Sequence, residues 1–181
     1  DICFSIPKIF FAYGFGNSVS FPMSVGAAAV LLSGRPTPEA SFSPIDRFRP
    51  TVLFGLPTLY TALAQDPGID SVDMGSVRLF VSAAEILSEE LAAGWRDRFG
   101  KPIVEGLGST EMLHIYLSND RDLQKPGSAG CVVPGYAVRL LTPDGKIAPK
   151  GTEGVMQVAG LSGAEYYWNR SDKTADTMQD G

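Results

Sequence analysis

Cysteine and histidine are scarce in this sequence: its 181 residues include two cysteines and one histidine. Cys3 and Cys131 lie far apart, and neither has a histidine or another cysteine close by in the sequence. We therefore expect two buried free thiols rather than a disulfide or a metal site. Asp70, Asp73 and Asp97 also lack the spacing of metal ligands.

Long apolar runs and blocks of one charge are missing as well. The longest apolar stretches, such as residues 27–32, are far shorter than the roughly 20 residues of a membrane-spanning helix, and the first residues do not resemble a signal peptide. Fifteen basic and twenty acidic residues give a net charge of −5 with no basic stripe, which argues against a nucleic-acid surface. We expect a soluble cytoplasmic protein that binds neither membranes nor nucleic acids.

Short apolar runs alternate with longer amphipathic segments over most of the chain, in which 44% of the residues are apolar. Runs rich in Val, Leu and Phe predict buried parallel strands at residues 28–33, 51–56, 77–82 and 102–105. The segments between them predict helices at residues 17–26, 38–48, 57–65 and 88–99. The last helix has Ser88 as its N-cap and Gly100 just beyond its end. This alternation predicts an α/β fold with a parallel sheet that is covered by helices on both faces.

The pattern changes after residue 125. Strand-like runs at residues 138–141 and 154–158 flank turn residues at 143–146, which predicts an antiparallel hairpin or the start of a barrel. A helix is expected at residues 169–178, with Asn169 as its cap. We therefore predict an α/β subdomain at residues 1–125 and a truncated β-rich, barrel-like subdomain with a terminal helix at residues 126–181. The polar residues 120–127, broken by Pro126, would form the hinge.

The most informative motif is EGLGSTE at residues 105–111, placed where a predicted apolar strand ends. Its glycines would let a ligand approach the backbone, while Ser109 and Thr110 could donate to phosphate oxygens. Glu111 offers a hard oxygen ligand of the kind that Mg²⁺ accepts. These residue types therefore fit a triphosphate site, whereas the spacing alone favours a plain turn.

The motif and its continuation MLHIYLSN at residues 112–119 resemble the core motif of adenylate-forming acyl-CoA synthetases, and most of all their benzoate–CoA ligase branch. Four other segments resemble further blocks of that family in the same order, at residues 10–17, 49–60, 82–85 and 134–136. The resemblance implies the large N-terminal domain of an acid–thiol ligase that uses ATP, Mg²⁺ and coenzyme A. It implies that Thr110 contacts the α-phosphate and that Glu111 holds the metal, both as catalytic residues.

The resemblance also implies a nucleotide site at the ends of two strands. Its residues would be Ser82, Ala83, Ala84, Glu85, Gly106, Leu107, Gly108, Ser109 and Thr110. Two positions depart from the family pattern: Ala84 replaces the usual Gly of the benzoate branch, and Leu107 replaces a Tyr that stacks on adenine in many relatives. Tight helix–strand packing is the alternative role of Ala83 and Ala84.

The acyl site implied by the resemblance is a flat slot for one aromatic ring. It would be lined by Ala12, Tyr13, Gly14, Gly106, Leu107, Gly108, His114 and Ile115. From its apolar neighbours alone, His114 fits a packed core residue, whereas the resemblance makes it a substrate contact. A histidine there could bond an ortho-amino or ortho-hydroxyl group, so anthranilate and salicylate are candidates beside benzoate.

The expected partners are a small aromatic acid and the rest of a parent enzyme, including its C-terminal domain, and a homodimer is also compatible. We expect this chain to be a piece of a longer protein and to be inactive alone, because the family's phosphate loop, ribose-binding Asp and catalytic Lys are absent from it. Two alternatives stay open, namely transfer of another small acid to a carrier protein and a non-catalytic nucleotide-binding lobe. The aromatic cluster at residues 166–168 is expected to pack in the core.

Overall fold

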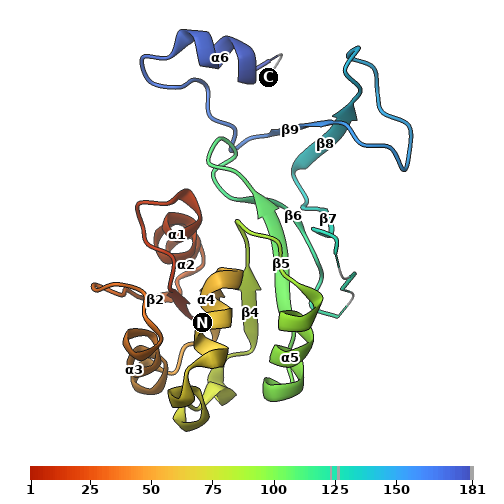
Figure 1. Ribbon diagram of the computed structural model, residues 1–181. Coiled ribbons are helices and arrows are strands. Elements are labelled where there is room, and N and C mark those ends of the chain that lie inside the picture. The colour runs from red at the N-terminus through yellow and green to blue at the C-terminus, as the bar shows by residue number, and fades with distance from the viewer. Residues whose placement is uncertain (123, 126, 180–181) are drawn as a thin grey trace.

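The computed structural model of the protein describes residues 1–122, 124–125 and 127–179. A seven-stranded sheet runs through its main body in the order β2-β1-β3-β4-β5-β6-β7 (Figure 1). Its parallel strands are β1 (Ile2–Ser5), β2 (Ala28–Val30), β3 (Val52–Gly55), β4 (Leu79–Ser82) and β5 (Ile103–Gly108). Two antiparallel strands complete the sheet, β6 (Ile115–Ser118) and β7 (Cys131–Val132).

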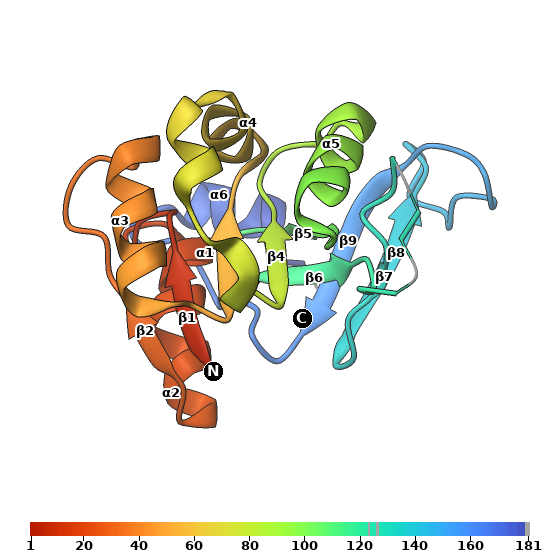
Figure 2. The same cartoon turned by 90° about the horizontal axis from the view of Figure 1, so that it is seen from below.

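Helices cover both faces of this sheet. Three of them lie along one face, as Figure 2 shows: α3 (Pro38–Phe48), α4 (Pro57–Gln65) and α5 (Glu89–Phe99). A continuous helical stretch covers the other face. It consists of α1 (Ala12–Phe15), the π-helical η1 (Gly16–Ser20) and α2 (Phe21–Val25). Two short 3₁₀ helices, η2 (Pro67–Ser71) and η3 (Met74–Ser76), lead from α4 to β4.

The main core lies between the sheet and helices α3 to α5. Successive side chains of a strand point to opposite faces, so residues paired across strands share a face. Phe4 pairs with Leu53, Leu53 with Phe80, and Phe80 with Ile103, and all four are fully buried in one cluster with Tyr60 and Trp95. Val52, Phe54 and Val81 point to the opposite face and form a smaller cluster. The strands are therefore apolar on both sides, as expected for a covered parallel sheet.

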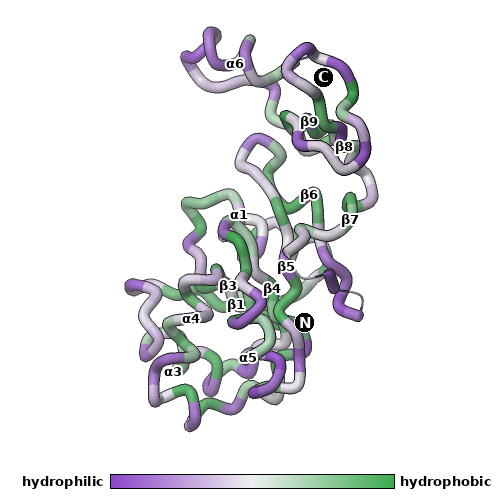
Figure 3. Tube along the Cα trace, turned by 45° about the vertical axis from the view of Figure 1, so that its right-hand side comes forward, coloured by the Kyte–Doolittle hydropathy of each residue, from purple (hydrophilic) through white to green (hydrophobic). Residues whose placement is uncertain are grey.

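A two-stranded antiparallel sheet follows, made of β8 (Tyr136–Leu141) and β9 (Val155–Gly160). The last helix, α6 (Ser171–Thr177), lies apart from the main body and carries few apolar residues (Figure 3). Among the described residues no helix is both long and apolar enough to cross a membrane.

Local signals predicted several elements well. The bounds of α3 and α4 agree with the prediction at residues 38–48 and 57–65. Ser88 caps α5 by accepting a hydrogen bond from the Leu91 amide at 3.2 Å, and Gly100 ends it with a φ of 68°. The hairpin predicted around residues 143–146 is present as β8 and β9.

Other predictions were wrong. Strand β1 was not predicted, and the helix expected at residues 17–26 begins earlier, at Ala12. Asn169 does not cap α6, because the N-cap position falls on Arg170 and no side chain makes the capping bond. Cys131 is exposed rather than buried, because it lies on the short edge strand β7.

The aromatic cluster at residues 166–168 does not pack in the core. Tyr166 and Trp168 are 58% and 79% exposed. The division at residues 125 and 126 stays a prediction; residue 126, and the chain end at residues 180–181, lie outside the described residues. Within the described part, β7 still pairs with the first sheet, so the second sheet begins only at Tyr136.

Candidate active site

The EGLGSTE motif lies mostly inside a strand and not in a loop after one. Strand β5 continues through Gly108 and turns into β6, so residues 109–114 form the tip of a β5–β6 hairpin. The segments that follow β1, β3 and β4 reach the same edge, because Gly55 pairs with Ser82 and Ser82 with Glu105. Ligands bind at this carboxyl edge in open α/β sheets.

A cavity of about 330 Å³, here called the inner cavity, lies between these segments and the hairpin. Its lining is mainly apolar and comes from five parts of the chain. These residues are Ile6, Pro7, Lys8, Phe11, Ala12, Tyr13, Pro36, Leu56, Thr58, Leu59, Ala83, Ala84, Gly108, Ser109, Thr110, Leu113, His114 and Ile115. The volume falls in the range of small-molecule sites.

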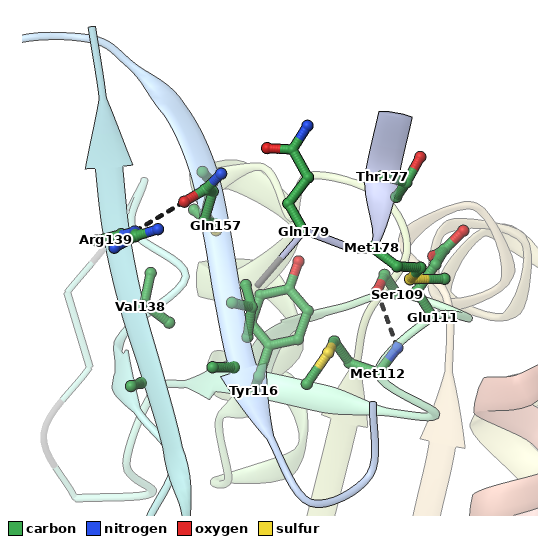
Figure 4. A pocket seen from close by; sticks show the side chains of 14 residues that line it. Ser109, Glu111, Met112, Tyr116, Val138, Arg139, Gln157, Thr177, Met178 and Gln179 are labelled. Carbon is green, nitrogen blue, oxygen red and sulfur yellow. Dashed lines mark hydrogen bonds between the residues drawn. The ribbon is translucent and has the colours of Figure 1, made fainter. Parts of the chain in front are cut away.

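A second cavity of about 430 Å³, here called the outer cavity, lies on the other side of the hairpin tip. Figure 4 shows Ser109 and Glu111 from the tip beneath Met178 and Gln179 at the end of the chain, with Arg139 and Gln157 of β8 and β9 opposite. Ser109 lines both cavities. The hairpin tip therefore separates an apolar space from a more polar one that contains the Glu111 carboxylate.

His114 lies between the inner cavity and the protein core. Its Nε2 lies 2.9 Å from Oδ1 of the buried Asn17, and its ring contacts Phe21 edge to face at 4.5 Å between centroids. Tyr13 lies 5.1 Å from the same ring, and its hydroxyl donates to the Val81 carbonyl over a long 3.4 Å. Burial lowers the pKa of His114 to about 4, partly opposed by a bond to the Tyr13 backbone. The imidazole is therefore neutral near pH 7.

This pKa predicts an acid-sensitive component of stability. The unfolded chain takes up a proton on His114 near pH 6.5 and the folded chain only near pH 4, so stability is lost as the pH falls through this window. We expect a loss of about 2 kcal/mol between pH 7 and pH 5 from this one group. His114→Gln, which can still donate to Asn17, is expected to lack that component. Urea unfolding of both proteins across this pH range measures it, and parallel pH profiles would contradict it.

Two glycines of the motif are required by packing within the hairpin. A Cβ on Gly106 would lie 2.8 Å from the Ile115 side chain, and one on Gly108 would lie 2.4 Å from the His114 carbonyl oxygen. A Cβ on Gly14 would similarly lie 2.1 Å from the Lys8 carbonyl oxygen. Their small size thus serves contact between backbone segments. A role in ligand approach stays a prediction for Gly106 and Gly108, and a place in the acyl site stays a prediction for Gly14.

The second strand end, residues 82–85, is held by its own contacts. Ser82 is fully buried, and its Oγ has no hydrogen-bond partner within the described residues. Ala84 has a φ of 72°, a region that costs a residue with a Cβ about 1 kcal/mol or more. The resembled branch usually carries Gly at this position, and glycine adopts such a φ at little cost. The strain therefore comes from the Cβ of Ala84. Glu85 accepts bonds from the amide and hydroxyl of Thr58, at 3.0 and 3.1 Å, and thereby caps α4.

Glu111 presents a carboxylate that is already partly engaged. Its Oε1 accepts a hydrogen bond from the Tyr167 hydroxyl at 2.5 Å, and this bond is the main cause of a lowered Glu111 pKa. No set of three or more His, Cys, Asp or Glu side chains in the described part of the chain could hold a metal ion. Mg²⁺ is commonly held by one or two carboxylates together with substrate phosphates, so Glu111 with its second oxygen fits a nucleotide-bound Mg²⁺.

The structure brings together part of each predicted set. Nine predicted residues line the inner cavity: Ala12, Tyr13, Ala83, Ala84, Gly108, Ser109, Thr110, His114 and Ile115. Gly14, Ser82, Glu85, Gly106 and Leu107 do not line it, and Glu111 lines the outer cavity instead. The functions assigned to all of these residues stay predictions.

Sequence reasoning missed several residues of the site. Lys8, Leu59 and Leu113 line the inner cavity, and Asn17 holds His114. Leu59 and Asn17 lie within segments that resemble family blocks, which could have drawn attention to them. Tyr167 had no such signal, because its contact with Glu111 spans 56 residues.

The parallel sheet with an apolar cavity and a Ser-Thr-Glu hairpin at its carboxyl edge agrees with what comparison with known proteins shows. The chain belongs to the family of AMP-binding enzymes, which matches residues 1–168. Two curated relatives make the likeness more specific. The benzoate–CoA ligase of Thauera aromatica is 45% identical over 179 residues, which cover 98% of this chain and 34% of the relative. The p-hydroxybenzoic acid–AMP ligase FadD22 of Mycobacterium marinum is 42% identical over 173 residues, covering 93% of this chain and 24% of the relative.

Solved structures agree with these relatives. A benzoate CoA ligase from Burkholderia xenovorans LB400 superposes with a TM-score of 0.93 at 41% identity, covering 99% of this chain and 37% of that one. The anthranilate CoA ligase AuaEII in complex with anthranoyl-AMP gives a TM-score of 0.94 at 34% identity, covering 99% of this chain and 35% of that one. The chain spans about a third of the length of the benzoate–CoA ligase it matches.

Proposed function

We propose that the protein containing this chain is an acid–thiol ligase that activates a small aromatic carboxylic acid of the benzoate or anthranilate class. The observation that carries the proposal is the inner cavity, an apolar space bounded by Tyr13 and His114 beside the hairpin tip that bears Ser109 and Thr110. Its volume of about 330 Å³ is enough for one ring, and Tyr13 and His114 close the slot in a way that disfavours a long acyl chain. The aromatic acids named for the relatives support the same class of substrate.

The proposed reaction has two steps. An oxygen of the acid's carboxylate attacks the α-phosphorus of ATP, the bond to the β-phosphate oxygen breaks, and pyrophosphate leaves. The thiol of coenzyme A then attacks the carbonyl carbon of the acyl-adenylate, loses its proton, and displaces AMP to give a thioester. Neither step needs a protein nucleophile, so catalysis depends on positioning and charge neutralisation.

Side chains of this chain can supply both the positioning and the charge neutralisation. Ser109 and Thr110 line the inner cavity, where their hydroxyls can donate to phosphate oxygens. Mg²⁺ bound to Glu111 would neutralise charge on the phosphates. Ala83 and Ala84 line the same cavity next to the hairpin and leave room for a flat purine. The remaining predicted residues at this edge would act through packing of the site.

In a second candidate function, the enzyme stops at the acyl-adenylate or transfers its acyl group to a carrier protein. It is favoured by the 42% identity to FadD22, which is named an AMP ligase. The two functions differ in product: a coenzyme A ligase releases an aryl thioester, and the alternative leaves free coenzyme A unchanged.

A panel of acids tests the proposal in the protein that contains this chain. We expect AMP release with benzoate-sized acids and none above background with palmitate, because Tyr13 and His114 would close the slot beyond a single ring. Omission of coenzyme A is the control that separates adenylation from thioester formation. A preference for acids of about eight or more carbons in a chain would contradict the one-ring cavity.

We also propose that the protein works in the cytoplasm, where ATP and coenzyme A are available and where thiols stay reduced. Cys3 and Cys131 are both free, which is compatible with that compartment. A C-terminal domain and a homodimer are further proposed partners, on the family resemblance alone.

A further inference from the structure

A segment from the end of the chain crosses over the hairpin tip. The Ser162 hydroxyl donates to the Met112 carbonyl at 2.8 Å, and the Ala164 amide donates to the Glu111 carbonyl at 2.7 Å. These two bonds hold the segment against the backbone of the motif. Three residues later, Tyr167 places its hydroxyl 2.5 Å from Glu111 Oε1.

Tyr167 is itself held from the other side by α6. Its amide donates to Thr174 Oγ1 at 2.9 Å, and that hydroxyl donates to the Arg170 carbonyl at 2.9 Å. The two neighbours of Tyr167 differ from it, since Tyr166 and Trp168 are largely exposed while Tyr167 is half-buried. Tyr167 is therefore fixed between α6 and the carboxylate, whereas the adjacent aromatic rings face solvent.

We infer that Tyr167 is a positioning residue for Mg²⁺·ATP: its hydroxyl holds the Glu111 carboxylate with one oxygen occupied and the other free for the metal. This inference rests on the proposed function. Partners that orient a metal-ligating carboxylate commonly contribute 10- to 100-fold, by order of magnitude, to metal affinity. The Glu111 carboxylate stands on a hairpin tip, and the Tyr167 hydroxyl is the main contact that fixes its orientation.

The test is ATP binding by isothermal titration, with Mg²⁺ and separately with EDTA, in the protein that contains this chain and without any acid substrate. Tyr167→Phe removes only the hydroxyl, and we expect it to weaken Mg²⁺·ATP binding about tenfold while metal-free ATP binding changes less than about twofold. Tyr166→Phe is the matched control and is expected to change neither constant. A purely structural role of Tyr167 would weaken both constants together and would overturn the inference.

A double-mutant cycle tests whether Tyr167 acts through Glu111. In the Glu111→Gln background we expect Tyr167→Phe to have no further effect on Mg²⁺·ATP binding, because the group that it orients has lost its charge. Additive losses would overturn the inference. Wild-type protein that binds no ATP would overturn the proposed function as well, whereas wild-type binding with an unchanged Tyr167→Phe variant would overturn only the role of Tyr167.

A second variant covers the case in which Tyr167→Phe does not fold. Thr174→Val removes the hydroxyl that accepts from the Tyr167 amide, and we expect a loss of about threefold in Mg²⁺·ATP affinity with metal-free binding unchanged. If Thr174→Val bound Mg²⁺·ATP with the same affinity as wild type, the inference would be overturned.

Discussion

Glu111→Gln is expected to lower ATP–pyrophosphate exchange by at least about tenfold, or about 1.4 kcal/mol of barrier, in the protein that contains this chain. The substitution keeps the size of the side chain and an acceptor for the Tyr167 hydroxyl, but it removes the negative charge that Mg²⁺ requires. The loss should be largest, about a hundredfold, when Mg²⁺ is limiting. Exchange measured across a range of Mg²⁺ concentrations gives both the rate and the metal requirement.

Glu165→Gln is the matched control for this experiment. Glu165 is exposed in the segment that crosses the hairpin tip and lines neither cavity, so its charge should not matter to exchange. An exchange rate for Glu111→Gln that equals wild type at every Mg²⁺ concentration would rule out Glu111 as a metal ligand.

Gly108→Ala is expected to destabilise the folded protein by about 3 kcal/mol or more and to abolish most of its activity. The added Cβ would lie 2.4 Å from the His114 carbonyl oxygen and 2.7 Å from its carbon. Both are backbone atoms of the residue just before β6, so relief requires β5 to separate from β6 near the register shift between Leu107 and Gly108. Urea unfolding followed by fluorescence, together with the exchange assay, measures both effects.

Gly94→Ala is the matched comparison, because it is expected to raise the stability of the folded protein slightly. Gly94 lies inside α5, and a Cβ there would meet no atom within 4 Å. Alanine in a helix interior is favoured over glycine by about 0.5–1 kcal/mol, so this variant should be slightly more stable than wild type. Equal unfolding midpoints for Gly108→Ala and Gly94→Ala would show that the close approach at the hairpin is not rigid.

The site is assembled from two parts with different physical character. The inner cavity is formed by the strand ends of the parallel sheet and is mainly apolar. The outer cavity is formed between the hairpin tip, the second sheet and the end of the chain, and it contains Glu111 and Arg139. The hairpin belongs to both, so a change at its tip should affect acid and metal binding together. The closely packed Gly106 and Gly108 keep this shared element rigid.

The sequence by itself determined the elements whose signals are local. Thr37 and Pro38 at the start of α3, Pro57 at the start of α4, and Ser88 and Gly100 around α5 act on backbone groups within a few residues. The order of the motif blocks likewise indicates the family without any knowledge of the fold. Capping and periodicity need no partner from elsewhere in the chain, so they can be recognised directly in the sequence.

Only the tertiary structure decided how the motif is used. A glycine-rich run favours a turn when considered locally, yet pairing with β6 makes Gly106 and Gly108 part of a strand. Glu85 caps α4 from 27 residues away, Asn17 meets His114 across 97 residues, and Tyr167 meets Glu111 across 56. These contacts form because the fold brings distant segments to one edge of the sheet, where burial and unpaired polar groups select their partners. No local pattern specifies such pairs, since each residue's own neighbours in the sequence are unaffected by them.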